Sequence, residues 1–273
     1  MKPAVRDRSV LWLPLVQRLT EASPRWTIWK NADAAFAGSG DIDSAAPLGD
    51  WELILREFRR WAAEHGLGPV IDCRHPPKTM FLLAVDPAGS DLLELDVSGR
   101  KYFRGGTLFR AEDLAPLTSL DERGFRCLRP GAQGLILLVT NGLRWGGRPD
   151  PGGLRKRRIP ELLASDRAGV MQAARCFGFP ERDVAKAVER LLSGDWDRRS
   201  MLAVEARALI RALLDPGMLA RRARFRLASK RSCPVLRIVF YGDRRVPGHQ
   251  GDWLREVERT HAVYREEGVG DAG

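Results

Sequence analysis

The sequence has few cysteines and no long apolar run, and each shortage excludes a class of protein. Its four cysteines lie far apart, at Cys73, Cys127, Cys176 and Cys233. Zinc sites and redox motifs usually place two ligands within a few positions, so we interpret all four as reduced thiols of a cytoplasmic protein. The apolar run from Leu135 to Val139 is far too short to span a bilayer, and residues 1–12 lack a secretory apolar stretch. We therefore expect no membrane partner.

A kinase-type phosphate loop is also missing. The stretch of residues 235–248 reads like a strand running into a phosphate loop, but Gly242 has no glycine five positions later and no Lys-Ser or Lys-Thr pair follows. That spacing is what a phosphate loop of this type requires. The sequence therefore excludes a kinase that uses this loop.

Lysine is scarce, whereas positive charge is abundant and uneven. The formal net charge is +10, and residues 151–273 hold 25 Lys and Arg against 16 Asp and Glu. Such an asymmetry favours an anionic partner, such as a nucleotide, a nucleic acid or a phosphorylated substrate. The second interpretation is that the 38 arginines against seven lysines reflect a GC-rich genome. Both interpretations stay open.

The hydrophobic pattern changes from mixed to helical along the chain. Strands are expected at 25–30, 41–46, 70–74, 80–85, 92–97, 107–110 and 235–241. Helices are expected at 9–22, 51–65, 130–145, 153–163, 167–177, 181–192, 198–214, 217–227 and 252–266. The pattern predicts an α/β (α+β) fold, with a mixed-sheet core at residues 1–128 followed by a mainly helical region at residues 129–273.

Two aspartates follow a glycine-rich turn at Gly38-Ser39-Gly40. In a strand, Asp41 and Asp43 project to the same side. Two such carboxylates repel each other unless a cation lies between them, and Mg²⁺ is commonly held by one or two carboxylates. The other Asp-x-Asp pair, Asp195 and Asp197, precedes a predicted helix and is interpreted as its N-terminal cap.

A third carboxylate, Asp96, lies in a strongly apolar predicted strand and shares its face with Glu94. Acids in so apolar a strand are unfavourable unless they are solvated or paired. If this strand neighbours the one that carries Asp41, three carboxylates gather. Two-metal phosphoryl transfer needs that arrangement.

These segments resemble a known family. The patterns Trp29-Lys30-Asn31, Gly40-Asp41-Ile42-Asp43 and Glu94-Leu95-Asp96 resemble the DNA polymerase β superfamily of nucleotidyltransferases, and most of all its small bacterial members. The segments at residues 128–131 and 156–166 resemble the helical region that follows the catalytic sheet in those proteins. The resemblance covers about residues 25–215.

The resemblance implies transfer of a nucleoside monophosphate from a nucleoside triphosphate such as ATP to a hydroxyl acceptor. Asp41 and Asp43 would bind both metals, Mg²⁺ or Mn²⁺. Asp96 would bind one metal and help to deprotonate the acceptor hydroxyl.

The nucleotide contacts are expected from two groups of residues. The superfamily has a Gly-Ser pair several residues before its Asp-x-Asp. Here Lys30-Asn31 stands at that place, while Gly38-Ser39, followed by Gly40, comes directly before Asp41. Either segment could grip the triphosphate. After the Asp96 strand, Lys101 and Arg104 either meet phosphate oxygens or simply flank a hairpin with its tip at Gly105-Gly106.

The acceptor divides the remaining hypotheses. The six basic residues between Arg221 and Arg231 favour tRNA or another anionic acceptor, although a protein or a small molecule stays open. One alternative is a non-catalytic nucleotide- or RNA-binding module with the same fold. Another is a glycosyltransferase that uses Asp-x-Asp to hold a nucleotide sugar, which leaves Asp96 unexplained.

Overall fold

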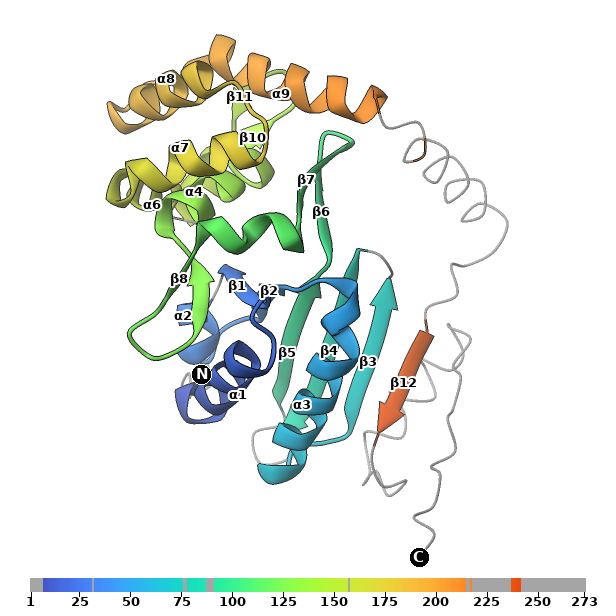
Figure 1. Cartoon of the computed structure of the whole chain (residues 1–273). Coiled ribbons are helices and arrows are strands. Elements are labelled where there is room, and N and C mark those ends of the chain that lie inside the picture. Colours follow the sequence, from blue (N-terminus) through green and yellow to red (C-terminus); the bar gives the residue numbers. More distant parts are fainter. Residues whose placement is uncertain are drawn as a thin grey trace, which may run out of the picture. The chain divides into compact units, whose positions relative to one another are not determined.

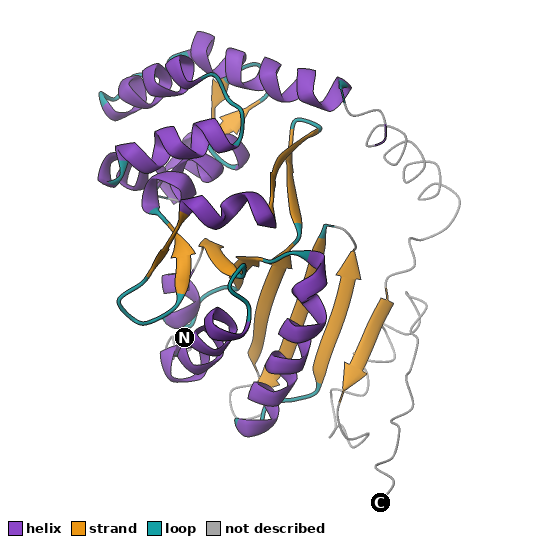
Figure 2. Cartoon of the chain, viewed as in Figure 1, coloured by secondary structure: helices purple, strands orange, loops and turns teal. Residues whose placement is uncertain are grey.

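The computed structural model describes residues 7–30, 32–75, 78–86, 91–156, 158–214, 217 and 237–241. Over this part the chain has the expected α/β composition, with helices and strands interleaved along the sequence (Figures 1 and 2). No helix in these ranges is both long enough and apolar enough to cross a membrane. The predicted helices at 217–227 and 252–266 lie outside the described residues, apart from Gly217.

The described residues form two compact units. Unit 1 takes those within 1–26, 31–99 and 225–273, and unit 2 takes 27–30 and those within 100–224. The functional division at residue 128 stays a prediction, whereas the chain passes into unit 2 at Arg100. The β6–β7 hairpin belongs to unit 2 partly because it packs closely there. A Cβ atom on Gly106 would lie 2.7 Å from the backbone oxygen of Ala208.

Unit 1 combines helices with five strands of a mixed sheet. Its helices are α1 (Ser9–Ala22), α2 (Ala32–Phe36) and α3 (Trp51–Glu64), with a short 3-10 turn at Leu48–Asp50. Its strands are β2 (Ile42–Ala45), β3 (Val70–His75), β4 (Thr79–Asp86), β5 (Asp91–Ser98) and β12 (Arg237–Tyr241). They run in the order β12-β3-β4-β5-β2, in which β2 and β5 are parallel and the other neighbours are antiparallel.

The core of unit 1 lies between these helices and the sheet. Helix α3 lies along β3 and β4 and buries the apolar face that its sequence spacing predicts (Figure 1). Trp12 of α1 stacks on Trp61 of α3, with ring centroids 5.4 Å apart, and both side chains are fully buried. The indole nitrogen of Trp61 donates a hydrogen bond of 2.8 Å to the oxygen of Leu11. The stacked rings and this hydrogen bond join α1 to α3.

Unit 2 is mainly helical, with short strands. Its helices are α4 (Pro130–Thr140), α5 (Pro151–Lys156), α6 (Ile159–Ser165), α7 (Arg167–Cys176), α8 (Glu181–Leu192) and α9 (Arg198–Leu213), with a 3-10 turn at Ala111–Leu117. Strand β9 (Arg126–Leu128) pairs with β1 (Thr27–Lys30) in parallel and with β8 (Thr118–Leu120) in antiparallel fashion. Hairpins join β6 (Arg100–Phe103) to β7 (Gly106–Arg110) and β10 (Leu143–Arg144) to β11 (Arg148–Pro149).

Asp166 holds the start of α4 and the start of α7 together. Its carboxylate accepts hydrogen bonds from the Arg129 guanidinium at 2.6 and 3.1 Å, and from the backbone nitrogens of Gly131 and Gly169 at 3.3 and 2.9 Å. The hydrogen bonds from Arg129 and from the two backbone nitrogens lower the pKa of this carboxyl, although burial opposes them. This network satisfies N–H groups at the N-termini of two helices with one side chain.

Two predicted helices differ from the structure by more than one residue at an end. The helix expected over 130–145 ends at Thr140, because Gly142 is packed against Leu138 and Leu154 and a hairpin follows. The helix expected over 153–163 is split between α5 and α6 around Arg158, which has a φ angle of 49°. Pro160 explains the break, since proline lacks the N–H group that a helix interior needs but suits a first turn.

Candidate functional site

The three predicted catalytic carboxylates lie together in unit 1. Strands β2 and β5 are parallel neighbours, and their register places Asp43 opposite Asp96. Asp41 directly precedes β2 and is two positions from Asp43, which puts both on one side of the strand. One carboxylate oxygen from each residue lies within 4.8 Å of the others. The structure therefore brings together acids that are more than 50 positions apart in the chain.

The tight turn of residues 38–40 directly precedes Asp41 and positions it in this cluster. Gly38 and Gly40 have φ angles of 84° and 88°, in the left-handed region that favours glycine. Between them, Ser39 binds back to α2, with its backbone nitrogen 2.8 Å and its hydroxyl 3.2 Å from the oxygen of Ala34. The predicted glycine-rich turn is thus confirmed as a turn. In this structure the hydroxyl of Ser39 stabilises the turn through its hydrogen bond to Ala34.

The sheet fixes the other two carboxylates. Asp43 is only 4% exposed, and the neighbouring Ser44 hydroxyl donates a hydrogen bond of 2.8 Å to the backbone oxygen of Asp96. The Oδ1 atom of Asp96 is buried and has no hydrogen-bond partner among the residues that the structure describes. A buried carboxylate oxygen without a partner is unfavourable, because its lost hydration is not replaced. An oxygen in that situation is a good ligand for a cation.

The electrostatics of the cluster favour a positive charge. Burial raises the pKa of Asp96 to about 8, and the charges of Asp43, Glu94 and Asp41 and a hydrogen bond with Glu94 add to the effect. Burial also raises the pKa of Glu94, with a contribution from Asp41 and an opposing one from its hydrogen bond with Asp96. These shifts express the repulsion among carboxyl groups in a partly desolvated place.

The donor set fits a hard divalent cation. All three groups offer oxygen, they come within ligand reach of one another, and one of their oxygens is buried without a partner. Mg²⁺ and Mn²⁺ prefer carboxylate oxygens, whereas the cysteines among the described residues are free and form no such group.

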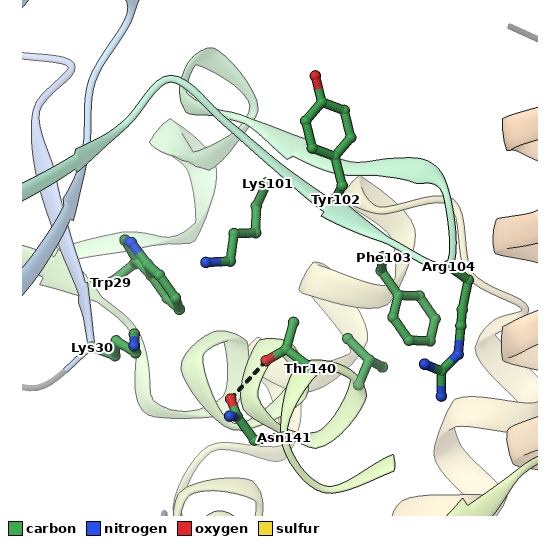
Figure 3. Close-up of a pocket in the computed structure, with 9 residues that line it drawn as sticks. Trp29, Lys30, Lys101, Tyr102, Phe103, Arg104, Thr140 and Asn141 are labelled. Carbon is green, nitrogen blue, oxygen red and sulfur yellow. Dashed lines mark hydrogen bonds between the residues drawn. The ribbon is translucent and has the colours of Figure 1, made fainter. Parts of the chain in front are cut away.

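Three of the predicted nucleotide contacts line a pocket of about 350 Å³ inside unit 2 (Figure 3). Lys30 lies at the end of β1, Lys101 lies in β6, and Arg104 lies in the turn after β6. Trp29 forms one wall, and Thr140 and Asn141, at the end of α4, line another part of the pocket. The predicted contact Asn31 lies outside the described residues.

Arg104 has strong partners inside unit 2. Its guanidinium pairs with Glu205, donates a hydrogen bond of 3.1 Å to the oxygen of Leu143, and lies 4.3 Å from the ring centroid of Trp145. Glu205 is 3% exposed and also accepts a hydrogen bond of 2.7 Å from the backbone of Gly147. Arg104 therefore anchors a pocket wall. The β6–β7 hairpin is present, but its turn is Arg104-Gly105, one residue earlier than the predicted tip at Gly105-Gly106.

Sequence reasoning missed some of these residues and identified others. Thr140 and Asn141 gave no signal, because they end an apolar helix that looked purely structural. Glu205 lies in an ordinary amphipathic helix, so its burial could not be foreseen. By contrast, the prediction that Asp197 caps a helix is confirmed, since its carboxylate accepts a hydrogen bond of 3.0 Å from the backbone nitrogen of Ser200.

Comparisons with protein-family models, with curated proteins and with solved structures gave no significant match for this chain.

Proposed function

We propose that this protein is a metal-dependent nucleotidyltransferase that moves a nucleoside monophosphate from a nucleoside triphosphate to a hydroxyl acceptor. The observation that carries the proposal is the convergence within 4.8 Å of Asp43 and Asp96, on adjacent parallel strands, with Asp41, which directly precedes β2. The Oδ1 atom of Asp96 supports it, because this oxygen is buried without a partner in the described part of the chain and would gain one from a bound cation.

The three carboxylates would have different tasks. Asp41 and Asp43 would hold Mg²⁺ or Mn²⁺, and Asp96 would complete the ligand set. When bound, the cations neutralise phosphate charge. The acceptor oxygen forms a bond to the α-phosphorus as the bond to pyrophosphate breaks, and Asp96 holds the proton that the hydroxyl releases. The protein contributes by fixing these groups on a rigid sheet, which is the main source of catalysis in phosphoryl transfer.

Cation and nucleotide binding can be tested by thermal denaturation. Mg²⁺ or Mn²⁺ with a nucleoside triphosphate should raise the melting temperature, because a ligand of the native state stabilises it. The double variant Asp41→Asn with Asp43→Asn should lose the shift. Asp195→Asn is the matched control, because it removes an exposed carboxylate from the chain's other Asp-x-Asp pair and should keep the shift. An unchanged shift in the double variant would contradict the assignment.

Catalysis can be separated from binding at Asp96. Asp96→Asn should keep nucleotide affinity within about tenfold and lower turnover at least about a hundredfold, the scale for losing a group that acts in the transition state. Glu94→Gln is the control on the same strand face and should be mild. The measurement is incorporation of labelled nucleoside monophosphate into an acceptor pool. If Glu94→Gln is inactive while Asp96→Asn is active, the roles of the two acids are exchanged.

The acceptor is tested separately. The positive charge of the second half favours tRNA or another anionic acceptor, whose affinity should fall steeply with salt. Absence of binding to tRNA or total RNA at low salt would favour a small molecule. A glycosyltransferase is less well supported, because it gives no task to Asp96, which lies opposite Asp43 in the β2–β5 register.

A further inference from the structure

The β10–β11 hairpin of unit 2 carries an exposed tryptophan at its tip. The turn between the two strands is Trp145-Gly146-Gly147, and it lies beside α9 (Figure 1). Trp145 is 64% exposed. Five other tryptophans are at most 2% exposed, namely Trp12, Trp26, Trp29, Trp51 and Trp61. Because water contact with so large an aromatic ring is unfavourable, its exposure favours a ligand that covers the ring.

Contacts within unit 2 hold this turn in place. The backbone nitrogen of Gly147 donates a hydrogen bond of 2.7 Å to the buried Glu205, and its oxygen accepts one of 2.7 Å from the indole nitrogen of Trp196. The oxygen of Gly146 accepts a hydrogen bond of 2.9 Å from Nε of Arg198. A Cβ atom on Gly147 would lie 2.7 Å from the backbone oxygen of Arg198, so the turn packs directly on α9. A backbone fixed in this way lowers the entropic cost of binding at Trp145.

Arginines surround the exposed ring. The Arg104 guanidinium lies 4.3 Å from the ring centroid of Trp145, and its buried ion pair commits it to supporting that face of the ring. Arg144 and Arg148 lie directly opposite each other in the hairpin register, and both are exposed. Arg144 donates a hydrogen bond of 3.3 Å to Asp150, whereas Arg148 has no hydrogen bond or ion pair with any described residue. Like charges opposite each other in a hairpin are unfavourable, so an anion beside Arg148 is favoured.

The chain around the hairpin is strongly basic. Residues 141–158 contain six basic residues and one acid, Asp150. The basic residues that the structure describes in this stretch are all exposed: Arg144, Arg148, Arg155, Lys156 and Arg158. An isolated anion would use this charge and leave the Trp145 ring in water. A single-stranded nucleic acid uses both, because its phosphates meet cations while its bases stack on aromatic rings.

We infer that the β10–β11 hairpin is a contact surface for single-stranded nucleic acid. An unpaired base stacks on the exposed part of the Trp145 ring, and a neighbouring phosphate lies at Arg148. A duplex keeps its base faces inside the helix and cannot use the ring in this way. The inference names a class of acceptor for the proposed transferase, and it rests on the proposed function only for the transfer step, because binding is measured without it.

The test is fluorescence anisotropy of the full chain in EDTA at low salt. The labelled probes are a single-stranded RNA of about 12 nucleotides, the matching DNA strand, and an abasic DNA strand of equal length, which suit the usual site sizes of such proteins. At least one of the strands with bases should bind about fivefold or more tightly than the abasic strand, because the phosphates are the same and only the bases differ. The tighter of RNA and DNA identifies the preferred sugar. Absence of binding by both, or equal affinity for the abasic strand, would overturn the inference.

Variants of the ring locate the stacking. Trp145→Ala should weaken binding of the preferred strand at least about fivefold and leave the abasic strand and a duplex unchanged, because only a stacking surface is lost. Trp145→Phe keeps an aromatic face and should retain most of the affinity. Leu120→Ala is the matched control, since Leu120 is 68% exposed in β8 of the same unit, and it should bind like the wild type. Wild-type affinity in Trp145→Ala, or an equal loss for the abasic strand, would refute the stacking.

A variant of the charge locates the phosphate. Arg148→Gln should make the salt dependence of affinity shallower by about 0.7 in log–log slope, the value for one phosphate contact in a single strand. Arg182→Gln is the control, an exposed arginine on α8 that has no ion pair with a described residue, and should keep the wild-type slope. An unchanged slope in Arg148→Gln, or an equal change in Arg182→Gln, would contradict the placement of the phosphate.

One further variant separates this inference from the proposed function. Asp41→Asn with Asp43→Asn should bind the preferred strand like the wild type in EDTA, because neither acid belongs to the hairpin. Loss of binding in this variant would count against the hairpin as the contact surface. If the metal-dependent shift of the proposed function fails while Trp145→Ala still loses its base-dependent binding, the surface stands without the transferase.

Discussion

Removing one charge from the acidic cluster should stabilise the protein when divalent cations are absent. Asp96 has a pKa of about 8 in the folded protein, against an ordinary value of 3.8. Between these values the folded state holds a proton that the unfolded state has lost, so stability falls as pH rises from about 4 to about 8. The shift sets a ceiling of about 6 kcal/mol at about 1.4 kcal/mol per unit. Asp96 is partly exposed, so screening reduces the expected gain for Asp96→Asn to about 1–3 kcal/mol at pH 8.

The assay is urea denaturation in EDTA at several pH values, followed by tryptophan fluorescence. The wild type should lose stability from pH 5 to pH 8, Asp96→Asn should lose less, and added Mg²⁺ should stabilise the wild type more than the variant. Asp195→Asn serves as the control for a general charge effect. A destabilised Asp96→Asn variant at pH 8, or a wild type whose stability rises over this range, would refute the argument from carboxylate repulsion.

Two other predictions concern unit 2. Gly169→Ala places a Cβ atom 2.0 Å from Oδ2 of Asp166 and should lower the unfolding free energy by about 2–4 kcal/mol, whereas Gly49→Ala, with no atom within 4 Å of its new Cβ, should stay within about 0.5 kcal/mol. Denaturation of both variants compares them directly. The backbone hydrogen bond from Ser200 lowers the pKa of Asp197 to about 2, so stability should fall as pH drops from about 4 towards 2. Asp197→Asn should flatten that decline in acid denaturation, and an unchanged decline would contradict the assignment.

Local sequence signals were sufficient for much of the secondary structure. The predicted bounds at 9–22 and 181–192 match α1 and α8, because amphipathic spacing is continuous there. The meeting of Asp43 with Asp96 needed one further assumption, that two acid-bearing strands are neighbours. The register confirms it. The alternation of side chains along a strand then predicts that Asp41 lies on the same side as Asp43.

Features built from distant segments could not be predicted. The pocket joins Trp29, Lys101 and Asn141, which no periodicity relates, and its shape depends on packing in three dimensions. Strands β8 and β9 have three residues each, too few to show alternation. The short helix α2 was missed for a similar reason, since five residues cannot display a helical pattern.

The assignment of β1 to unit 2 limits how the protein can be dissected. Residues 27–30 belong to a body whose other residues begin at 100, so an expression clone of residues 100–224 would lack one of its own strands. Such a fragment would leave β9 without its parallel partner, at the Ile28 and Cys127 pair, and would expose a strand edge that promotes aggregation. It would also lose Trp29 and Lys30. Complementation with a synthetic peptide of residues 24–32 should therefore improve the solubility of the fragment.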